Sequence, residues 1–220
     1  MADIDVDKIL EQSEKAEEKQ LKEGLIKKLA IGGGAVGVAA IIALIIILVS
    51  LGERSAKYFP LEPGFKYVYN KKGKSPEEWK VLSKKTDIGG YSCSMINRID
   101  QGNFSSKQEY YYTGKEGVIR VAYSKNFGSK KESQLVVLPP RIKKGAKFSG
   151  GTIRGTEIEG VIQDREILNT FLGEVEALKV SYSGGKYVNK TVWYAEGVGL
   201  VKEEDRANRG EMGLISLEKE

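Results

Sequence analysis

The distribution of apolar residues divides the chain into three parts. Residues 29–51 form an unbroken run of 23 positions without a charged side chain. As a helix this run would be roughly 34 Å long, at about 1.5 Å per residue, which is enough to cross a bilayer. A cleaved signal peptide is the alternative, but its apolar region would be only about 7 to 15 residues long and closer to the start of the chain. We therefore predict a single transmembrane helix over residues 29–51.

The first 28 residues are polar, with 8 acidic and 6 basic side chains. Apolar residues recur there at helical spacing only in patches, which predicts a polar helical tail over residues 1–28 rather than a coiled coil. Lys27 and Lys28 lie directly before the apolar run. Because basic residues flank membrane spans on the cytoplasmic side, we place the N-terminus in the cytoplasm and the C-terminal domain in the periplasm or outside the cell.

Small residues within the apolar run recur every four positions. Gly33 and Gly37 have this spacing, which lets two transmembrane helices approach closely. The functional hypothesis is contact with a second copy of the chain or with another envelope protein. Since glycine and alanine are frequent in membrane spans, an isolated helix is the alternative.

Beyond residue 52 the apolar period changes to two. After a linker over residues 52–63, "GFKYVYN" places Phe65, Tyr67 and Tyr69 on one face, and "GVIRVAYS" does the same with Ile119 and Val121. Alternation of this kind is typical of half-buried strands. Further short runs rich in Val, Leu and Tyr, bounded by turn residues, are "EYYYTG", "SQLVVLPP", "GEVEALKVSY" and "KYVNKTVWY". The pattern predicts about ten strands and an antiparallel domain over residues 64–220.

The predicted domain contains no convincing helical period. A large antiparallel sheet without helices to cover it must bury its apolar face by curling on itself. The fold class is therefore predicted as mainly β, a strongly curved sheet or half-barrel that follows an N-terminal helix and a transmembrane helix.

The stretch "TVWYAEGVGLV" at residues 191–201 combines two large aromatic residues with two glycines. Either a tight reversal at Gly197 or a strand bent by a bulge at Gly199 explains it, and both put Trp193 and Tyr194 at the end of a strand. Glu196 is the only acid there, so no paired acid–base site can be argued. We interpret the stretch as a packing corner.

Residue types missing from the chain exclude several kinds of chemistry. There is no histidine, which removes the usual general base near neutral pH and the commonest metal ligand. The single cysteine, Cys93, alternates with polar residues in "GYSCSMINRI" and is predicted on the buried face of a strand. We therefore expect no catalytic residue, no cofactor, no metal and no enzymatic activity.

The domain is basic, with 29 basic and 22 acidic residues after position 52. Lys71, Lys72 and Lys74 in "NKKGK" are candidate contacts to the membrane surface, because basic residues near an anionic leaflet are attracted to it. Solvated loops that protect sheet edges are the alternative. No motif of a nucleic-acid-binding fold occurs, so nucleic acid is not an expected partner.

The tyrosines of "EYYYTG" alternate between two faces. Tyr110 and Tyr112 share one face and Tyr111 lies on the other. They could line a groove for sugars or peptides, or they could fill the core of the curved sheet.

Two stretches resemble a family of bacterial extracytoplasmic domains, often lipoproteins and mostly of unknown function. "YFPLEPGFKYVY", with Tyr58, Pro60 and Gly64, is similar to the family's opening, and Trp193 to Lys202 match its closing signature. "REILNTFLGEVEALKV" is similar to the segment that precedes this signature. The resemblance implies a β-rich fold and no particular activity. Many members carry a lipidated cysteine where this chain has an apolar run, which points to the inner membrane.

Three functions are compatible with the sequence. The first is a non-enzymatic, single-pass module that binds or scaffolds a partner in the cell envelope, as an accessory subunit of a membrane complex. The second is a carrier that holds lipid or lipidated cargo in a half-open barrel, for which a large contiguous apolar lining is expected. A hydrolase that uses only Asp and Glu is the third, and it lacks a paired acid–base signature.

Overall fold

The computed structural model describes residues 53–103, 105–125, 131–186 and 188–219. The predicted tail (1–28), the predicted span (29–51), Gly33 and Gly37 lie outside these residues. Within the described residues, no helix has the length and apolar character needed to cross a membrane.

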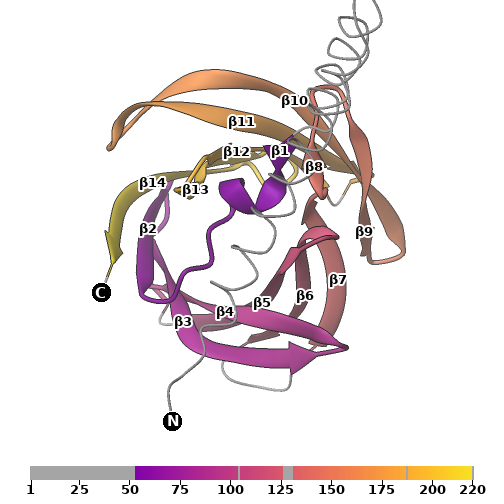
Figure 1. Ribbon diagram of the computed structural model, residues 1–220. Helices are drawn as coiled ribbons and strands as arrows, with labels where there is room; N and C mark the ends of the chain where they lie inside the picture. Colours follow the sequence, from indigo (N-terminus) through magenta and orange to yellow (C-terminus); the bar gives the residue numbers. More distant parts are fainter. Residues whose placement is uncertain (1–52, 104, 126–130, 187, 220) are drawn as a thin grey trace, which may run out of the picture. The chain divides into compact units, whose positions relative to one another are not determined.

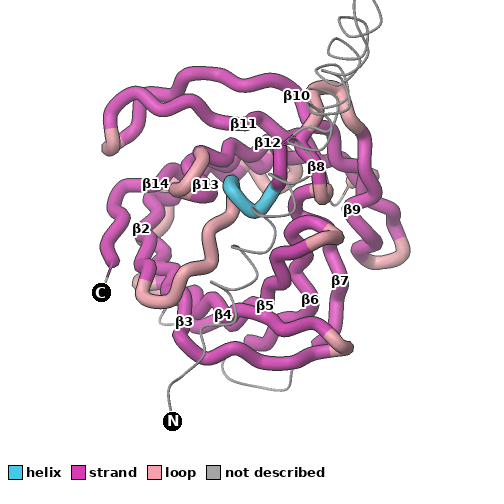
Figure 2. Tube along the Cα trace, in the orientation of Figure 1, coloured by secondary structure: helices cyan, strands magenta, loops and turns pink. Residues whose placement is uncertain are grey.

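The described residues are almost entirely β-strand, as predicted. One turn of 3-10 helix, η1 (Ser55–Tyr58), is the only helical element in the described ranges, where it stands out in cyan (Figure 2). The strands of the described part are β1 (Glu53–Arg54), β2 (Phe65–Lys71), β3 (Glu77–Ile88), β4 (Tyr91–Asp100), β5 (Ser105–Gly114), β6 (Gly117–Lys125), β7 (Lys131–Leu138), β8 (Arg141–Ile142), β9 (Lys147–Ile153), β10 (Thr156–Thr170), β11 (Gly173–Gly184), β12 (Val188–Ala195), β13 (Gly199–Asp205) and β14 (Gly210–Lys219).

Twelve of these strands form one antiparallel sheet in the order β7-β6-β5-β4-β3-β2-β14-β13-β12-β11-β10-β9. Neighbours in the sheet are also neighbours in sequence, except that β2 pairs with β14 and so joins the two ends of the domain. Figure 1 shows the strands wrapping around η1. The predicted strong curvature is therefore confirmed.

The two edges of the sheet, β7 and β9, approach each other along a line that we call the seam. Gly151 of β9 has φ = 93°, and a Cβ atom there would lie 2.6 Å from the carbonyl oxygen of Gln134 in β7. The hydroxyl of Tyr182 donates a hydrogen bond to the carbonyl oxygen of Val137. No strand ladder joins the described parts of β7 and β9, so side chains and close packing hold the seam together.

The prediction of a linker over residues 52–63 is wrong for residues 53–63, which are part of the packed domain. Tyr58 and Phe59 are only 3% and 7% exposed, and the ring of Phe59 lies 5.0 Å from that of Tyr111. The backbone N–H of Gly197 donates to the carbonyl oxygen of Lys57 at 2.8 Å. Burial of two large aromatic rings stabilises the fold strongly, so these residues lie inside the curved sheet and fill part of its interior. We call residues 53–63 the interior segment.

Alternation along β4, β5 and β6 follows the sequence pattern, but both faces of these strands are used. Ile96 and Tyr111 belong to the main core. A second apolar cluster takes Cys93, Tyr110, Ile119 and Val121 from the other face of these strands, together with Ile88 of β3 and Ala122, which follows an irregularity in the β6–β7 pairing. Cys93 is fully buried there, as predicted.

Candidate functional site

The curved sheet surrounds a partly open cavity of about 280 Å³. This volume is near the lower end of the range for small-molecule sites. Aromatic side chains from five segments line it: Phe59, Trp79, Tyr111, Tyr182 and Tyr194. Aliphatic side chains on both sides of the seam complete this part of the lining, among them Leu135, Val137, Ile153 and Ile158.

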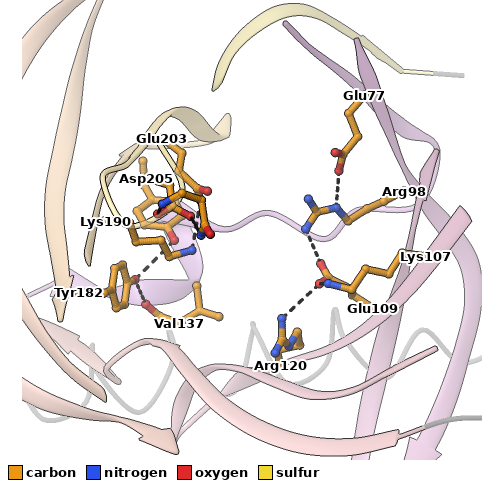
Figure 3. Close-up of polar contacts among 12 residues, drawn as sticks. Glu77, Arg98, Lys107, Glu109, Arg120, Val137, Tyr182, Lys190, Glu203 and Asp205 are labelled. Carbon is orange, nitrogen blue, oxygen red and sulfur yellow. Dashed lines mark hydrogen bonds and ion pairs between the residues drawn. The ribbon is translucent and has the colours of Figure 1, made fainter. Parts of the chain in front are cut away.

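One side of the cavity is charged, and its centre is the carboxylate of Glu109. This side chain is fully buried, at 0% exposed. It accepts hydrogen bonds from Arg98 Nη1 at 3.0 Å, Arg120 Nη1 at 3.2 Å and the Tyr111 hydroxyl at 2.8 Å, and also pairs with Lys107. We call Arg98, Lys107 and Arg120 the cationic wall (Figure 3); Arg98 and Arg120 line the cavity, and Lys107 contacts Glu109 from behind this lining.

A second buried carboxylate, Glu77, extends this network. Its Oε1 accepts from Arg98 Nε at 2.5 Å and from the indole N–H of Trp79 at 2.7 Å, and the carboxylate also pairs with Lys71. The guanidinium of Arg98 lies 4.1 Å from the centroid of the Trp79 ring. Four cationic side chains thus share two carboxylates, which leaves the network two positive charges in excess.

Burial alone would raise the pKa of Glu109. Arg98, Lys107 and Arg120 more than offset this effect and hold the pKa of the carboxyl well below its usual range. Glu109 is therefore ionised in the folded protein. Burial also lowers the pKa of Lys107, although the neighbouring Glu109 opposes this effect.

The facing side of the cavity carries the opposite charge. Glu203 and Asp205 of β13 line it together with Lys190 of β12, and Lys190 Nζ lies 3.1 Å from Glu203 Oε2. Asp205 Oδ2 accepts from Asn208 Nδ2 at 2.7 Å. Figure 3 shows this acidic side and the cationic wall on opposite sides of a gap. The cavity therefore combines aromatic surface with two charged sides of opposite sign.

The residues of the predicted packing corner lie at the turn between β12 and β13. Gly197 and Gly199 have φ angles of 72° and 97°, and Ala195 pairs with Gly199, so the tight reversal is the geometry adopted. A Cβ atom on Gly199 would lie 3.4 Å from Pro60 Cδ. Since 3.4 Å is an ordinary van der Waals distance, the positive φ of Gly199, rather than a lack of space beside Pro60, favours glycine here.

Trp193 and Tyr194 face opposite sides of β12. Tyr194 lines the cavity, with its hydroxyl 3.5 Å from that of Tyr182. Trp193 is not among the lining residues. Its indole N–H donates to Glu166, and the ammonium groups of Lys179 and Lys202 lie 5.3 and 4.8 Å from its ring centroid. Only one residue of this aromatic pair is available to a molecule in the cavity.

Tyr58 and Gly64 stabilise the ends of the interior segment. The hydroxyl of Tyr58 donates to Glu53 Oε2 at 2.6 Å and accepts from Arg165 Nη2 at 2.9 Å. Gly64, with φ = 87°, donates its N–H to the carbonyl oxygen of Val81 at 3.0 Å. Their contacts are internal to the domain.

The three lysines proposed as membrane contacts do not form one surface. Lys71 is only partly exposed and pairs with Glu77 inside the charged network. Lys72 and Lys74 are exposed, and Lys72 Nζ lies 3.7 Å from Glu211 Oε2. The ammonium group of Lys71 turns toward a buried carboxylate, which disfavours a role for this lysine at a membrane surface. The role of the other two lysines stays a prediction.

The described residues contain no group of three or more Asp, Glu or Cys side chains arranged to hold a metal ion. The sequence also did not reveal which charged residues line the cavity. Arg98, Glu109 and Arg120 stand at the polar positions of alternating strands, where a solvent-facing side chain is the ordinary expectation. Their meeting depends on strand register, which no local motif encodes.

The chain matches no known protein family and no curated protein. Two solved structures are similar to it. One is the crystal structure of a protein from Bacteroides fragilis described as exported and as having a YmcC-like fold, with 15% identity over 74% of this chain and 99% of that chain and a TM-score of 0.47. The other, described as a lipoprotein from Parabacteroides distasonis, has 18% identity over 73% of this chain and 98% of that chain, with a TM-score of 0.35. These TM-scores are too low to assign a fold family, so the family resemblance stays a prediction.

Proposed function

We propose that the domain is a ligand-binding module that takes a small molecule into the cavity of its curved sheet. The observation that supports this most directly is the convergence of aromatic and charged side chains on one partly open cavity. Such a combination of apolar surface and a few placed polar groups is typical of small-molecule sites. The proposal is non-enzymatic, in line with the absence of histidine.

The cavity supports a polar ligand better than an acyl chain. A lipid carrier was expected to have a large contiguous apolar lining. The observed lining contains Arg98, Arg120 and Glu203, whose charged groups an acyl chain would desolvate without offering hydrogen bonds. We therefore favour a small polar molecule over lipid or lipidated cargo.

A docking role for the domain is the second candidate, and one surface favours it. At the far end of the β10–β11 hairpin, Ile167, Phe171 and Leu172 are 70%, 45% and 44% exposed. Large apolar side chains grouped on a protruding hairpin favour contact with a partner. This retains the scaffold or accessory-subunit hypothesis, with another envelope protein as the partner.

The uncharged run at residues 29–51 supports a membrane tether for the module. In this proposal residues 29–51 anchor the chain in the inner membrane, and the domain lies in the periplasm or outside the cell. Contact between tethers at Gly33 and Gly37 remains part of the proposal.

One purification can test both candidates. The full chain in mild detergent is incubated with a cell extract and isolated by gel filtration, and the retained molecules are identified by mass spectrometry. We expect a small molecule that the wild type retains and that Val137→Trp and Leu135→Trp lose, because an indole at either position fills the cavity. Ile215→Trp, which places the same ring on an exposed position, is the matched control.

The docking candidate predicts a different loss. A co-purifying protein should disappear from Phe171→Ser/Leu172→Ser and persist in Val137→Trp. Retention of the same small molecules by the wild type and by both cavity-filling variants would contradict the ligand-binding proposal, provided that the variants keep the wild-type circular dichroism spectrum.

A further inference from the structure

We infer that the ligand of the cavity is a small organic anion, whose negatively charged group lies against Arg98 and Arg120 and whose apolar body lies against the aromatic lining. This inference rests on the proposed function and names the chemical class of its ligand.

The excess of positive charge is the first argument. Arg98, Lys107 and Arg120 share the single carboxylate of Glu109, and Glu77 is shared between Arg98 and Lys71. Buried charges are costly unless each finds a counter-charge. A carboxylate or phosphoryl group entering from the cavity would supply a second counter-charge in direct contact with Arg98 and Arg120, beside that of Glu109.

The guanidinium of Arg120 is the second argument. It donates one hydrogen bond to a carboxylate, from Nη1 to Glu109 over 3.2 Å. Its Nε is buried without a hydrogen-bond partner among the described residues. Arginine presents several N–H donors in a planar fork that suits carboxylate and phosphate groups. Of the residues in the cationic wall, Arg120 thus has the most unused donor capacity facing the cavity.

The remaining lining suits an apolar body of limited size. Phe59, Tyr111 and Tyr194 lie close together. The centroid of the Phe59 ring is 5.0 Å from that of Tyr111 and 6.1 Å from that of Tyr194. On the facing side, Glu203 and Asp205 disfavour a second anionic group. We therefore expect one negatively charged end and an uncharged chain or ring.

Fluorescence of Trp79 gives a direct readout. The chain has two tryptophans, and Trp79 lines the cavity whereas Trp193 does not. In the full-length Trp193→Phe protein, Trp79 is thus the only indole. Its emission is followed while hexanoate, hexylamine or 1-hexanol is added at constant ionic strength. We expect a saturable change with hexanoate and responses to the other two only at concentrations about tenfold higher or more.

Arg120→Met, which keeps the length of the side chain but removes the charge, should weaken the hexanoate response at least about tenfold. Arg120→Lys should restore part of it. Arg154→Met, at an exposed position of the β9–β10 turn, should leave it unchanged. Since Arg120→Met reduces an excess of positive charge, it should fold, which its unfolding curve can verify.

The possible failures are distinguishable. If hexylamine or 1-hexanol acts as well as hexanoate, the cavity binds small molecules but the inference of an anion is overturned. The same holds if Arg120→Met responds like the wild type. A response to none of the three probes overturns both the anion inference and the proposed cavity.

Discussion

Glu109→Gln is expected to lower the free energy of unfolding by about 3–5 kcal/mol, because it removes a fully buried charge and leaves three partly buried cations without their shared counter-charge. Glutamine keeps the size of the side chain and can still accept a hydrogen bond from Tyr111, so the loss reports on charge rather than on packing. Urea unfolding of the full chain in mild detergent, followed by tryptophan fluorescence, measures it.

The control is Glu159→Gln. Glu159 also pairs with a lysine, with Lys147 Nζ 3.1 Å from its Oε1, but both side chains are largely exposed. Exposed pairs contribute only about 0–1 kcal/mol. A change in Glu109→Gln as small as that in the control would mean that the buried network is not assembled as described.

The difference in unfolding free energy between the wild type and Glu109→Gln has a defined pH dependence. Since the cationic wall holds the folded-state pKa of Glu109 below its ordinary value of 4.5, the stabilisation is fully present above that pH. It is lost as the pH falls further, toward the folded-state pKa. The difference in stability between wild type and Glu109→Gln should therefore shrink below about pH 4.

Phe59→Ala should also destabilise the domain, by about 3–5 kcal/mol, the usual cost of removing a buried phenylalanine ring. Phe59 is 7% exposed and packs on Tyr111 and Tyr194, so its removal would enlarge the cavity and detach the interior segment from the sheet. The same urea unfolding measures this loss.

Phe171→Ala is the matched control, because Phe171 is 45% exposed at the end of a hairpin. We expect a change within about 0.5 kcal/mol, as for most surface substitutions. If both variants lost stability equally, residues 53–63 would not be part of the packed interior.

The strand pattern could be predicted from the sequence because the alternation is local. The period-two runs at Phe65–Lys71 and Gly117–Lys125 became β2 and β6, and the lack of helical segments predicted the strong curvature. Alternation separates two faces of a strand but does not say which face the sheet encloses. In β6 the face of Ile119 and Val121 joins the second cluster, and Arg120 lines the cavity instead.

The charged network could not be predicted from the sequence, because it depends on how neighbouring strands are paired. Arg98 and Glu109 come from neighbouring strands, with Ile96 opposite Glu109 and Arg98 opposite Lys107. This register, together with the bulge after Tyr110 in the β5–β6 pairing, brings Arg98 and Arg120 to one carboxylate. A one-residue shift would turn these side chains to the other face.

The two stretches that carry the family resemblance are distant in sequence but in contact in the fold. Pro60 lies over Gly199, and the N–H of Gly197 donates to Lys57. The interpretation of the closing stretch as a packing corner predicted a packed turn at Gly197 and Gly199. It could not identify the partner, because the segment at residues 52–63 had been treated as a linker.

The central claim is that the domain encloses an accessible cavity with one cationic side. Collisional quenching of Trp79 tests it most directly, with the full-length Trp193→Phe protein and two quenchers of opposite charge, iodide and caesium. We predict that iodide quenches Trp79 several times more strongly than caesium and that Arg120→Met narrows this difference. Equal quenching by the two ions, or none by either, would contradict the claim.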